Sequence, residues 1–329
     1  MKQSVVALLL GFSLFFSAGQ SQAATRSDLG VHILRTDELA KAVAFIDDDD
    51  VSTSSYVTIP YSYADMKDPW RWQTFFEECG RLGITPIVRL TTEFHDGVWA
   101  VPTQKQVADQ ISSLDALVWP GGERYIIVYN EVNHAAEWGG TLDPAGYSDI
   151  LEFATNWAHS ESADFVVLPA AMDLDAPNSV VTMEAFSFLR QMQAYNPEVL
   201  QLIDVWNSHS YPNPGFTASP ERVGKNSVRG FTAELALLKE LTGRDLHVMI
   251  TETGWRDNGA LFPWLESYYE YAMQHVWSDS RVIAVTPFIL QGAPGPFAGF
   301  SMLDESGELT SQGEAVRKIV APVSGGEKL

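Results

Sequence analysis

The chain has 329 residues, of which 46% are hydrophobic and 19% charged, and its formal net charge is −21. This hydrophobic content is enough for a sizeable core and argues against a disordered chain. The acidic excess disfavours nucleic acid, anionic lipid and polyuronates as partners, and favours a neutral or cationic ligand. The single cysteine, Cys79, excludes an internal disulfide and a cysteine metal centre.

The N-terminus has the pattern of a secretory signal. Lys2 precedes a short apolar run at residues 5–16, and Ser21 and Ala23 are small residues at the positions that signal peptidase reads. The run is too short for a membrane span, and no later segment replaces it. The sequence therefore predicts a signal peptide at residues 1–23, a single domain at residues 24–329, and a secreted or periplasmic monomer.

Strand and helix patterns alternate along the rest of the chain. Eight short apolar runs rich in β-branched residues predict strands, and eight amphipathic segments predict the helices that follow them. The predicted strands are residues 30–34, 56–61, 84–90, 125–131, 165–171, 203–208, 246–252 and 282–290. The predicted helices are residues 37–46, 70–82, 104–117, 147–160, 183–195, 231–241, 263–276 and 310–320.

This alternation predicts the α/β class, with parallel strands joined by crossover helices. Eight units of even spacing predict a closed (β/α)8 TIM barrel. The alternative is an open doubly wound sheet, which would carry a glycine-rich first turn that Leu34, Arg35 and Thr36 do not supply. The sequence contains no dinucleotide fingerprint and no phosphate loop, so no cofactor is expected.

Two of the predicted strands end in a carboxylate. Glu131 directly follows an apolar run and Asn130, and Glu252 follows a second apolar run that ends in Thr251. One such glutamate would be interpreted as a polar strand terminus. Two of them, each set among Asn, His, Tyr and Trp, match the pair of carboxylates that glycosidic acid/base chemistry requires.

These segments resemble those of clan A glycoside hydrolases, which are retaining enzymes on a (β/α)8 barrel, and family 39 is the nearest family. The resemblance covers nearly the whole mature chain. Two departures stand out: Val132 replaces the proline that often follows the acid/base glutamate, and Phe288 and Gln291 lie where many members end strand eight with a tryptophan. The segments that carry the resemblance are Asn130-Glu131, Arg89, His209-Ser210-Tyr211 and residues 250–255.

The resemblance implies that Glu131 is the acid/base and Glu252 the nucleophile. Mutual repulsion would keep one proton on the pair near neutral pH. Arg89 is then expected to favour the ionised form of Glu252, and Asn130 to bond the sugar 2-hydroxyl. Tyr211 or His209 would hydrogen-bond Glu252 and orient it, with Tyr211 preferred.

Three tryptophans follow predicted strands and are expected to stack on sugar rings. Trp99, Trp138 and Trp255 lie in three different loops, which predicts a cleft with several sugar subsites and hence internal cleavage. No metal is predicted, because the paired histidines of a metal hydrolase are missing. The acidic run from Asp47 to Asp50 is interpreted as a solvated turn, with a calcium site as the alternative.

The sequence thus predicts a secreted retaining glycoside hydrolase that degrades a β-linked polysaccharide or oligosaccharide by double displacement, without cofactor. Alternatives are a carbohydrate-binding barrel without catalysis and a transglycosylase that uses the same residues. A protein-interaction or matrix protein is a third alternative, and it predicts no pocket around the two glutamates.

Overall fold

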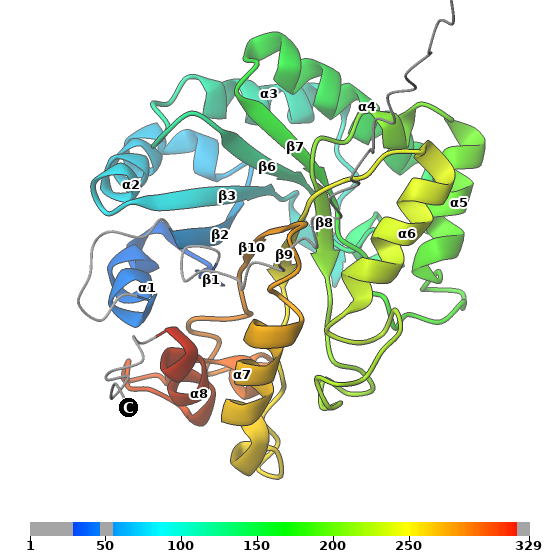
Figure 1. Ribbon diagram of the computed structural model, residues 1–329. Helices are drawn as coiled ribbons and strands as arrows, with labels where there is room; N and C mark the ends of the chain where they lie inside the picture. Colours follow the sequence, from blue (N-terminus) through cyan, green and yellow to red (C-terminus); the bar gives the residue numbers. More distant parts are fainter. Residues whose placement is uncertain (1–28, 47–54, 321–329) are drawn as a thin grey trace, which may run out of the picture.

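The computed structural model describes residues 29–46 and 55–320. The predicted signal peptide at residues 1–23 and the acidic run from Asp47 to Asp50 lie outside these residues. Eight parallel strands surrounded by helices form a (β/α)8 barrel, as the sequence predicts (Figure 1). The barrel strands are β1 Gly30–His32, β2 Ser55–Tyr61, β3 Ile84–Leu90, β6 Arg124–Val128, β7 Phe165–Pro169, β8 Trp206–His209, β9 Val248–Glu252 and β10 Val282–Val285.

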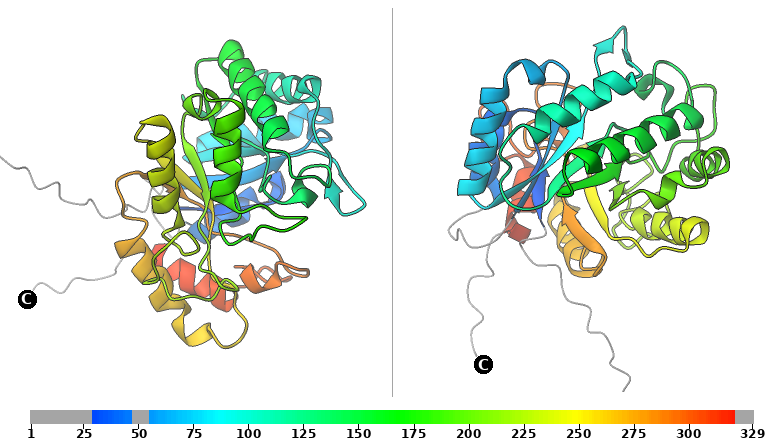
Figure 2. Two further views of the ribbon diagram at one scale, coloured as in Figure 1. Left: turned by 90° about the vertical axis from the view of Figure 1, so that its right-hand side faces the viewer. Right: turned by 90° about the horizontal axis from the view of Figure 1, so that it is seen from above.

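The helices lie outside the strands in all three views (Figures 1 and 2). Several helices have capping residues that fix where they begin or end. Asp68 and Asp143 cap α2 and α4 by accepting from the backbone N–H of Arg71 and Gly146, and Gly243 ends α6 in the left-handed conformation with φ 75°. None of the described helices combines the length and apolar character needed to span a membrane. The helices are α1 Leu39–Ile46, α2 Pro69–Arg81, α3 Gln104–Asp115, α4 Pro144–Glu161, α5 Ala185–Tyr195, α6 Gly230–Thr242, α7 Leu265–His275 and α8 Ser311–Val320.

The barrel consists of two sheets that meet at two seams. One sheet has the strand order β1-β2-β3-β6-β7 and the other β10-β9-β8. An isolated bridge between Leu29 and Val285 joins β1 to β10. At the seam between β7 and β8, Asp204 donates its backbone N–H to the carbonyl of Val167 at 3.2 Å. At this second seam Asn207 also donates its side-chain amide to the carbonyl of Pro169 at 3.1 Å.

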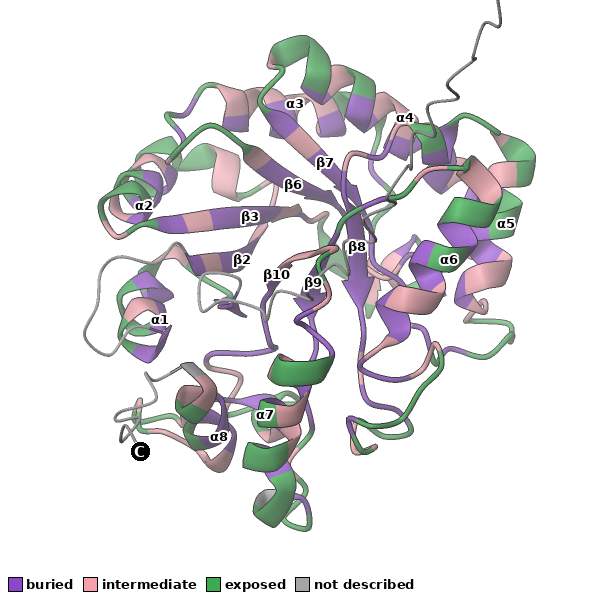
Figure 3. Ribbon diagram, viewed as in Figure 1, coloured by how far each residue is buried: buried purple, intermediate pink, exposed green. Residues whose placement is uncertain are grey.

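The interior of the barrel is filled with apolar side chains. The strands are buried along most of their length, whereas the outer faces of the helices are exposed (Figure 3). Because side chains alternate along a strand, Arg89 faces the same side of β3 as Ile87, which belongs to a buried cluster drawn mainly from the strands. The cluster comprises Ile87, Tyr125, Ile127, Leu168, Val205, Met249 and Ala284.

Strand boundaries differ from the prediction where the backbone turns early. The last strand ends at Val285 and not at residue 290, and it is followed by Pro287, which has no N–H to donate to a ladder. The loop after β3 contains a hairpin that was not predicted, β4 Phe94–His95 and β5 Val98–Trp99. Asp96 and Gly97 make its two-residue turn with φ of 51° and 83°, as tight hairpin turns require.

Candidate active site

The carboxyl ends of the strands surround a cavity of about 940 Å³. Its lining comes from residues that end or follow all eight barrel strands and from β5. This volume lies within the roughly 300–1,000 Å³ that is typical of ligand pockets. Active sites of (β/α)8 enzymes lie at this face of the barrel, so the cavity is the candidate site.

Glu252 is the last residue of β9, and only 8% of its surface is exposed. Arg89 donates from Nη1 to its Oε1 at 2.6 Å, and the Tyr211 hydroxyl donates to its Oε2 at 3.1 Å. Burial by itself would raise the pKa of Glu252, but the positive charges of His209 and Arg89 hold that pKa well below its usual range. Glu252 is therefore an ionised carboxylate at neutral pH.

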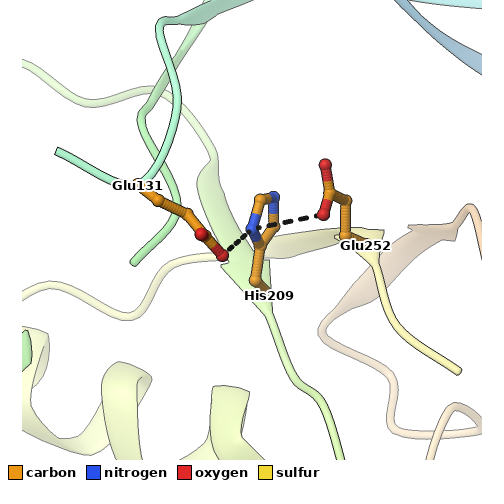
Figure 4. A group of neighbouring side chains, drawn as sticks. All are labelled: Glu131, His209 and Glu252. Atoms are coloured by element: carbon orange, nitrogen blue, oxygen red, sulfur yellow. Dashed lines mark hydrogen bonds and ion pairs between the residues drawn. The ribbon is translucent and has the colours of Figure 1, made fainter. Parts of the chain in front are cut away.

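Glu131 lies beyond the end of β6. The strand stops at Val128, and the chain then takes left-handed conformations at Tyr129 and Glu131, with φ of 71° and 29°. Such conformations cost on the order of 1–3 kcal/mol in residues that carry a Cβ. The result is that a carboxylate oxygen of Glu131, one of Glu252 and a ring nitrogen of His209 all lie within 4.8 Å of one another (Figure 4).

His209 stands between the two glutamates (Figure 4). Its Nδ1 is 2.9 Å from Glu131 Oε1 and 3.7 Å from Glu252 Oε2. Burial lowers the pKa of His209, but the charge of Glu252 and the hydrogen bond to Glu131 outweigh it and raise the pKa overall. His32 is also buried, with Nε2 3.7 Å from Glu252 Oε1, but burial and the charge of Arg89 lower its pKa to about 3, so it is neutral.

Arg89 connects the two strand-end motifs. The same Nη1 that contacts Glu252 also donates to Asn130 Oδ1 at 2.8 Å, which leaves the amide NH2 of Asn130 as its donor. The Asn130 side chain also lies within reach of Glu137, in the 3-10 helix Ala135–Glu137, and helps to lower the pKa of that carboxyl group. Arg89 thus contacts Glu252 and Asn130, and Asn130 lies next to Glu137.

Two of the three predicted tryptophans contribute to the cavity lining. Trp99 lies there half-buried in β5. Trp138 also belongs to the lining, but it is only 1% exposed and packs edge-on against Tyr129 and Tyr147. It is therefore a wall residue with little free face for stacking.

Trp255 lies outside the cavity lining, contrary to the expectation that it faces the substrate. It is 0% exposed, packs against Tyr268 and Tyr269, and donates its indole N–H to the carbonyl of Ala218 at 2.7 Å. Gly254, with φ 128°, turns the chain directly after β9. A core position that satisfies the indole N–H stabilises a large apolar side chain more than an exposed loop position does.

Sequence reasoning missed an aromatic wall on one side of the cavity. Phe216, Phe288, Phe297 and Phe300 pack with Tyr211 in edge-to-face pairs whose ring centroids are 5.0–6.1 Å apart. These residues come from the loops after β8 and β10. Only Phe288 could be anticipated, because it stands where a strand-eight tryptophan was expected, and the other three occur in irregular loops without a pattern.

The cluster of Glu131, His209 and Glu252 offers three ligand atoms close enough together to hold a metal ion. Two carboxylates and an imidazole suit several divalent cations. The guanidinium of Arg89, 2.6 Å from Glu252, opposes this because it places a positive charge against one of the ligands. The same arrangement suits a nucleophile that must stay ionised beside a second carboxyl group.

No protein-family model and no curated protein matches the sequence. Solved structures share its fold. A family 39 glycoside hydrolase from Bacteroides cellulosilyticus WH2 matches with a TM-score of 0.57 at 13% identity, over 92% of this chain and 64% of that one, so the chain spans less than two thirds of that structure.

Two further structures with this fold are described as family 5 proteins. GH5_18 from Streptomyces cattleya, solved in complex with GlcNAc, matches with a TM-score of 0.61 at 15% identity, over 89% of this chain and 79% of that one. XacCel5A, solved in complex with cellopentaose, matches with a TM-score of 0.58 at 12% identity, over 92% of this chain and 100% of that one. At this level of identity the likeness establishes the barrel fold.

Proposed function

We propose that the chain is a retaining glycoside hydrolase that cleaves β-glycosidic bonds in a polysaccharide or oligosaccharide. The observation that carries the proposal is the Glu131–Glu252 pair, with one oxygen of each within 4.8 Å at the mouth of the barrel. Retaining enzymes hold their two carboxyl groups about 5–5.5 Å apart, whereas inverting enzymes leave about 6.5–9.5 Å for a water. The short gap supports direct attack by one carboxylate on the sugar.

The surroundings of each glutamate support the assignment of roles. Glu252, ionised beside Arg89, attacks the anomeric carbon and forms the glycosyl-enzyme bond while the bond to the leaving oxygen breaks. Glu131 gives its proton to that oxygen, then takes a proton from the water that releases the sugar from Glu252. His209 holds Glu131 Oε1 at 2.9 Å, which leaves Oε2 to handle the proton.

Neighbouring side chains would hold the sugar in place. The amide NH2 of Asn130 is available to bond the sugar 2-hydroxyl, since its carbonyl oxygen accepts from Arg89. Trp99 offers a partly exposed indole for stacking. A cavity lined from all eight barrel strands fits a chain that crosses the barrel mouth, and internal cleavage by an exported enzyme is the mode we propose.

The test is a pair of matched substitutions assayed on an aryl β-glycoside with a good leaving group. Glu131→Gln should still form the glycosyl-enzyme, because the leaving group departs without a proton, but should then stall, and azide should restore turnover as a nucleophile that needs no base. Glu252→Gln has no nucleophile and should show neither a burst nor trapped sugar.

Glu78→Gln is the control, because this half-buried α2 residue lies outside the cavity lining and forms an ion pair with Arg81. Rescue by azide at position 252 and not at 131, with configuration retained, would reverse the two roles. Wild-type activity in both active-site variants would refute the proposal.

A metal-dependent hydrolase is the second candidate, because Glu131, His209 and Glu252 have ligand atoms within 4.8 Å of one another. Dialysis against EDTA separates the two. The retaining mechanism predicts unchanged kcat/KM after dialysis, whereas loss of activity with recovery on adding a divalent cation would favour the metal mechanism.

A further inference from the structure

The charges that line the cavity are almost all paired with one another. Six acidic side chains belong to the lining, together with three arginines, Arg35, Arg71 and Arg89. Each arginine already has a carboxylate partner, so none is free for an anionic ligand. The pairs are Arg35–Asp37, Arg71–Asp65 and Arg89–Glu252, with Asp173 and Glu131 paired to His134 and His209.

Glu137 is the exception among the six. No lysine, arginine or histidine of the described residues forms an ion pair with it. The neutral amide of Asn130 lies within reach of its side chain. It is half-buried in the cavity wall beside Glu131. Burial and the charge of Glu131 raise the pKa of Glu137 to about 7, so a nearby positive charge would favour its ionised form.

The position of Glu137 relative to the proposed reaction is fixed by Asn130. Asn130 Oδ1 accepts from Arg89, and the Asn130 side chain also lies within reach of Glu137. A sugar whose 2-position approaches the Asn130 amide therefore also approaches a carboxyl group that, when ionised, only accepts hydrogen bonds. A sugar hydroxyl at that position can accept a hydrogen bond from the Asn130 amide or donate one to Glu137. An ammonium group can only donate, so it requires the Glu137 carboxylate.

We propose that the cavity takes a β-linked sugar chain with free amines, and that Glu137 binds the ammonium group of one amino sugar. This inference rests on the proposed glycoside hydrolase function and narrows it to a substrate class. An ammonium group would supply the positive partner that Glu137 lacks. A sugar carboxylate or sulfate, by contrast, would find no unpaired arginine in the lining. The formal net charge of −21 would further attract a polycationic chain.

The test compares chitosan, chitin and cello-oligosaccharides of equal length, which share backbone and linkage and differ at the 2-position. Binding is measured by calorimetry in a Glu131→Gln background, which blocks turnover. A charge-assisted hydrogen bond contributes about 1.5–3 kcal/mol, so chitosan should bind at least roughly tenfold more tightly than the other two.

Adding Glu137→Gln should abolish that preference, because glutamine has the shape of the protonated acid but carries no charge. Binding of the cello-oligosaccharide should change by less than about threefold, within the worth of one neutral hydrogen bond. Glu93→Gln is the matched control: it removes the same charge from an exposed residue in the loop after β3, outside this lining, and should leave the preference intact.

Three outcomes would overturn the inference: chitosan binding no more tightly than the neutral chains, Glu137→Gln weakening all three alike, or Glu93→Gln acting as strongly as Glu137→Gln. The aryl glycoside assay stays separate from this result. If turnover depends on Glu252 but binding shows no preference for the amine, the amino-sugar inference is wrong and the proposed hydrolase function stands. If no turnover depends on Glu252, the proposed hydrolase function is wrong.

Discussion

Two buried glutamates on either side of β8 behave in opposite ways. Glu252 lies in the cavity beside His209, while Glu234, on α6, is 0% exposed and accepts a hydrogen bond from Ser208. Ser208 and His209 are consecutive, so they point to opposite faces of the strand. Burial raises the pKa of Glu234 to about 7, whereas the pKa of Glu252 is held well below its usual range.

The difference shows that burial does not decide the charge of a carboxyl group in this barrel. Glu234 has hydroxyl and indole neighbours, which stabilise a carboxylate only modestly. Glu252 has a guanidinium at 2.6 Å and a histidine at 3.7 Å. The predictions below remove these neighbours one at a time, beginning with the one that should matter most.

Replacing Arg89 by methionine should make Glu252 resemble Glu234. Loss of the guanidinium raises the pKa of Glu252, so the acid limb of the pH–rate profile should move to higher pH. Removing one charged group that stabilises the reacting carboxylate should lower kcat/KM by about 10²–10³-fold. The control is Arg190→Met, which breaks the surface pair with Glu240 and should leave activity unchanged. An unshifted acid limb would show that Arg89 does not set the charge of Glu252.

Replacing Tyr211 by phenylalanine removes the weaker partner of Glu252. The aromatic packing against Phe216 and Phe300 is kept, and only the 3.1 Å hydrogen bond to Oε2 is lost. A neutral hydrogen bond contributes about 1 kcal/mol, so kcat should fall roughly five- to tenfold. Because Glu252 is still paired with Arg89, the acid limb should move much less than in Arg89→Met. A loss as large as in Arg89→Met would mean that the hydroxyl takes part in the reaction directly.

Replacing Glu234 by glutamine should leave activity within about twofold and change only the pH dependence of stability. The folded-state pKa is raised to about 7, so the stability from the protonated carboxyl is complete below the unfolded pKa of about 4.3 and is lost as pH rises through 7. Wild type should therefore lose up to roughly 4 kcal/mol over this range through Glu234, and the variant should not. Thermal unfolding of both proteins between about pH 5 and pH 8 measures this loss of stability. If the stability of wild type and variant changed with pH in the same way, Glu234 would not have the raised pKa assigned to it.

The barrel could be predicted from sequence because its strands and helices carry regular patterns. The strand at residues 84–90 was predicted at its observed bounds, and the helix predicted at residues 231–241 is observed as Gly230–Thr242. The strand expected from residue 203 begins at Trp206, since the preceding Val199–Gln201 forms a 3-10 helix. Such local turns depend on tertiary packing that periodicity does not report.

The candidate site was predictable only where residues are tied to strand ends. Arg89, Tyr211 and Glu252 end or closely follow strands, and their side chains meet in the structure. Glu137 was missed because it ends a short 3-10 helix after β6, where nothing in the local pattern reveals that it lines the cavity. Trp255 was misplaced for the complementary reason: it directly follows a strand, yet the backbone at Gly254 sends it into the core.

The two glutamates of the proposed reaction are carried by different sheets. The loop that carries Glu131 leaves the five-stranded sheet, while Glu252 ends a strand of the three-stranded sheet. Below the cavity the seam between them is fastened by Asp204, which accepts from the backbone N–H of Val167 at 2.8 Å and contacts His159 at 2.9 Å. Displacing a reacting group by about 1 Å can cost roughly 10²-fold in rate. We therefore expect substitutions at this seam to change the rate of the proposed reaction, although they do not contact the sugar.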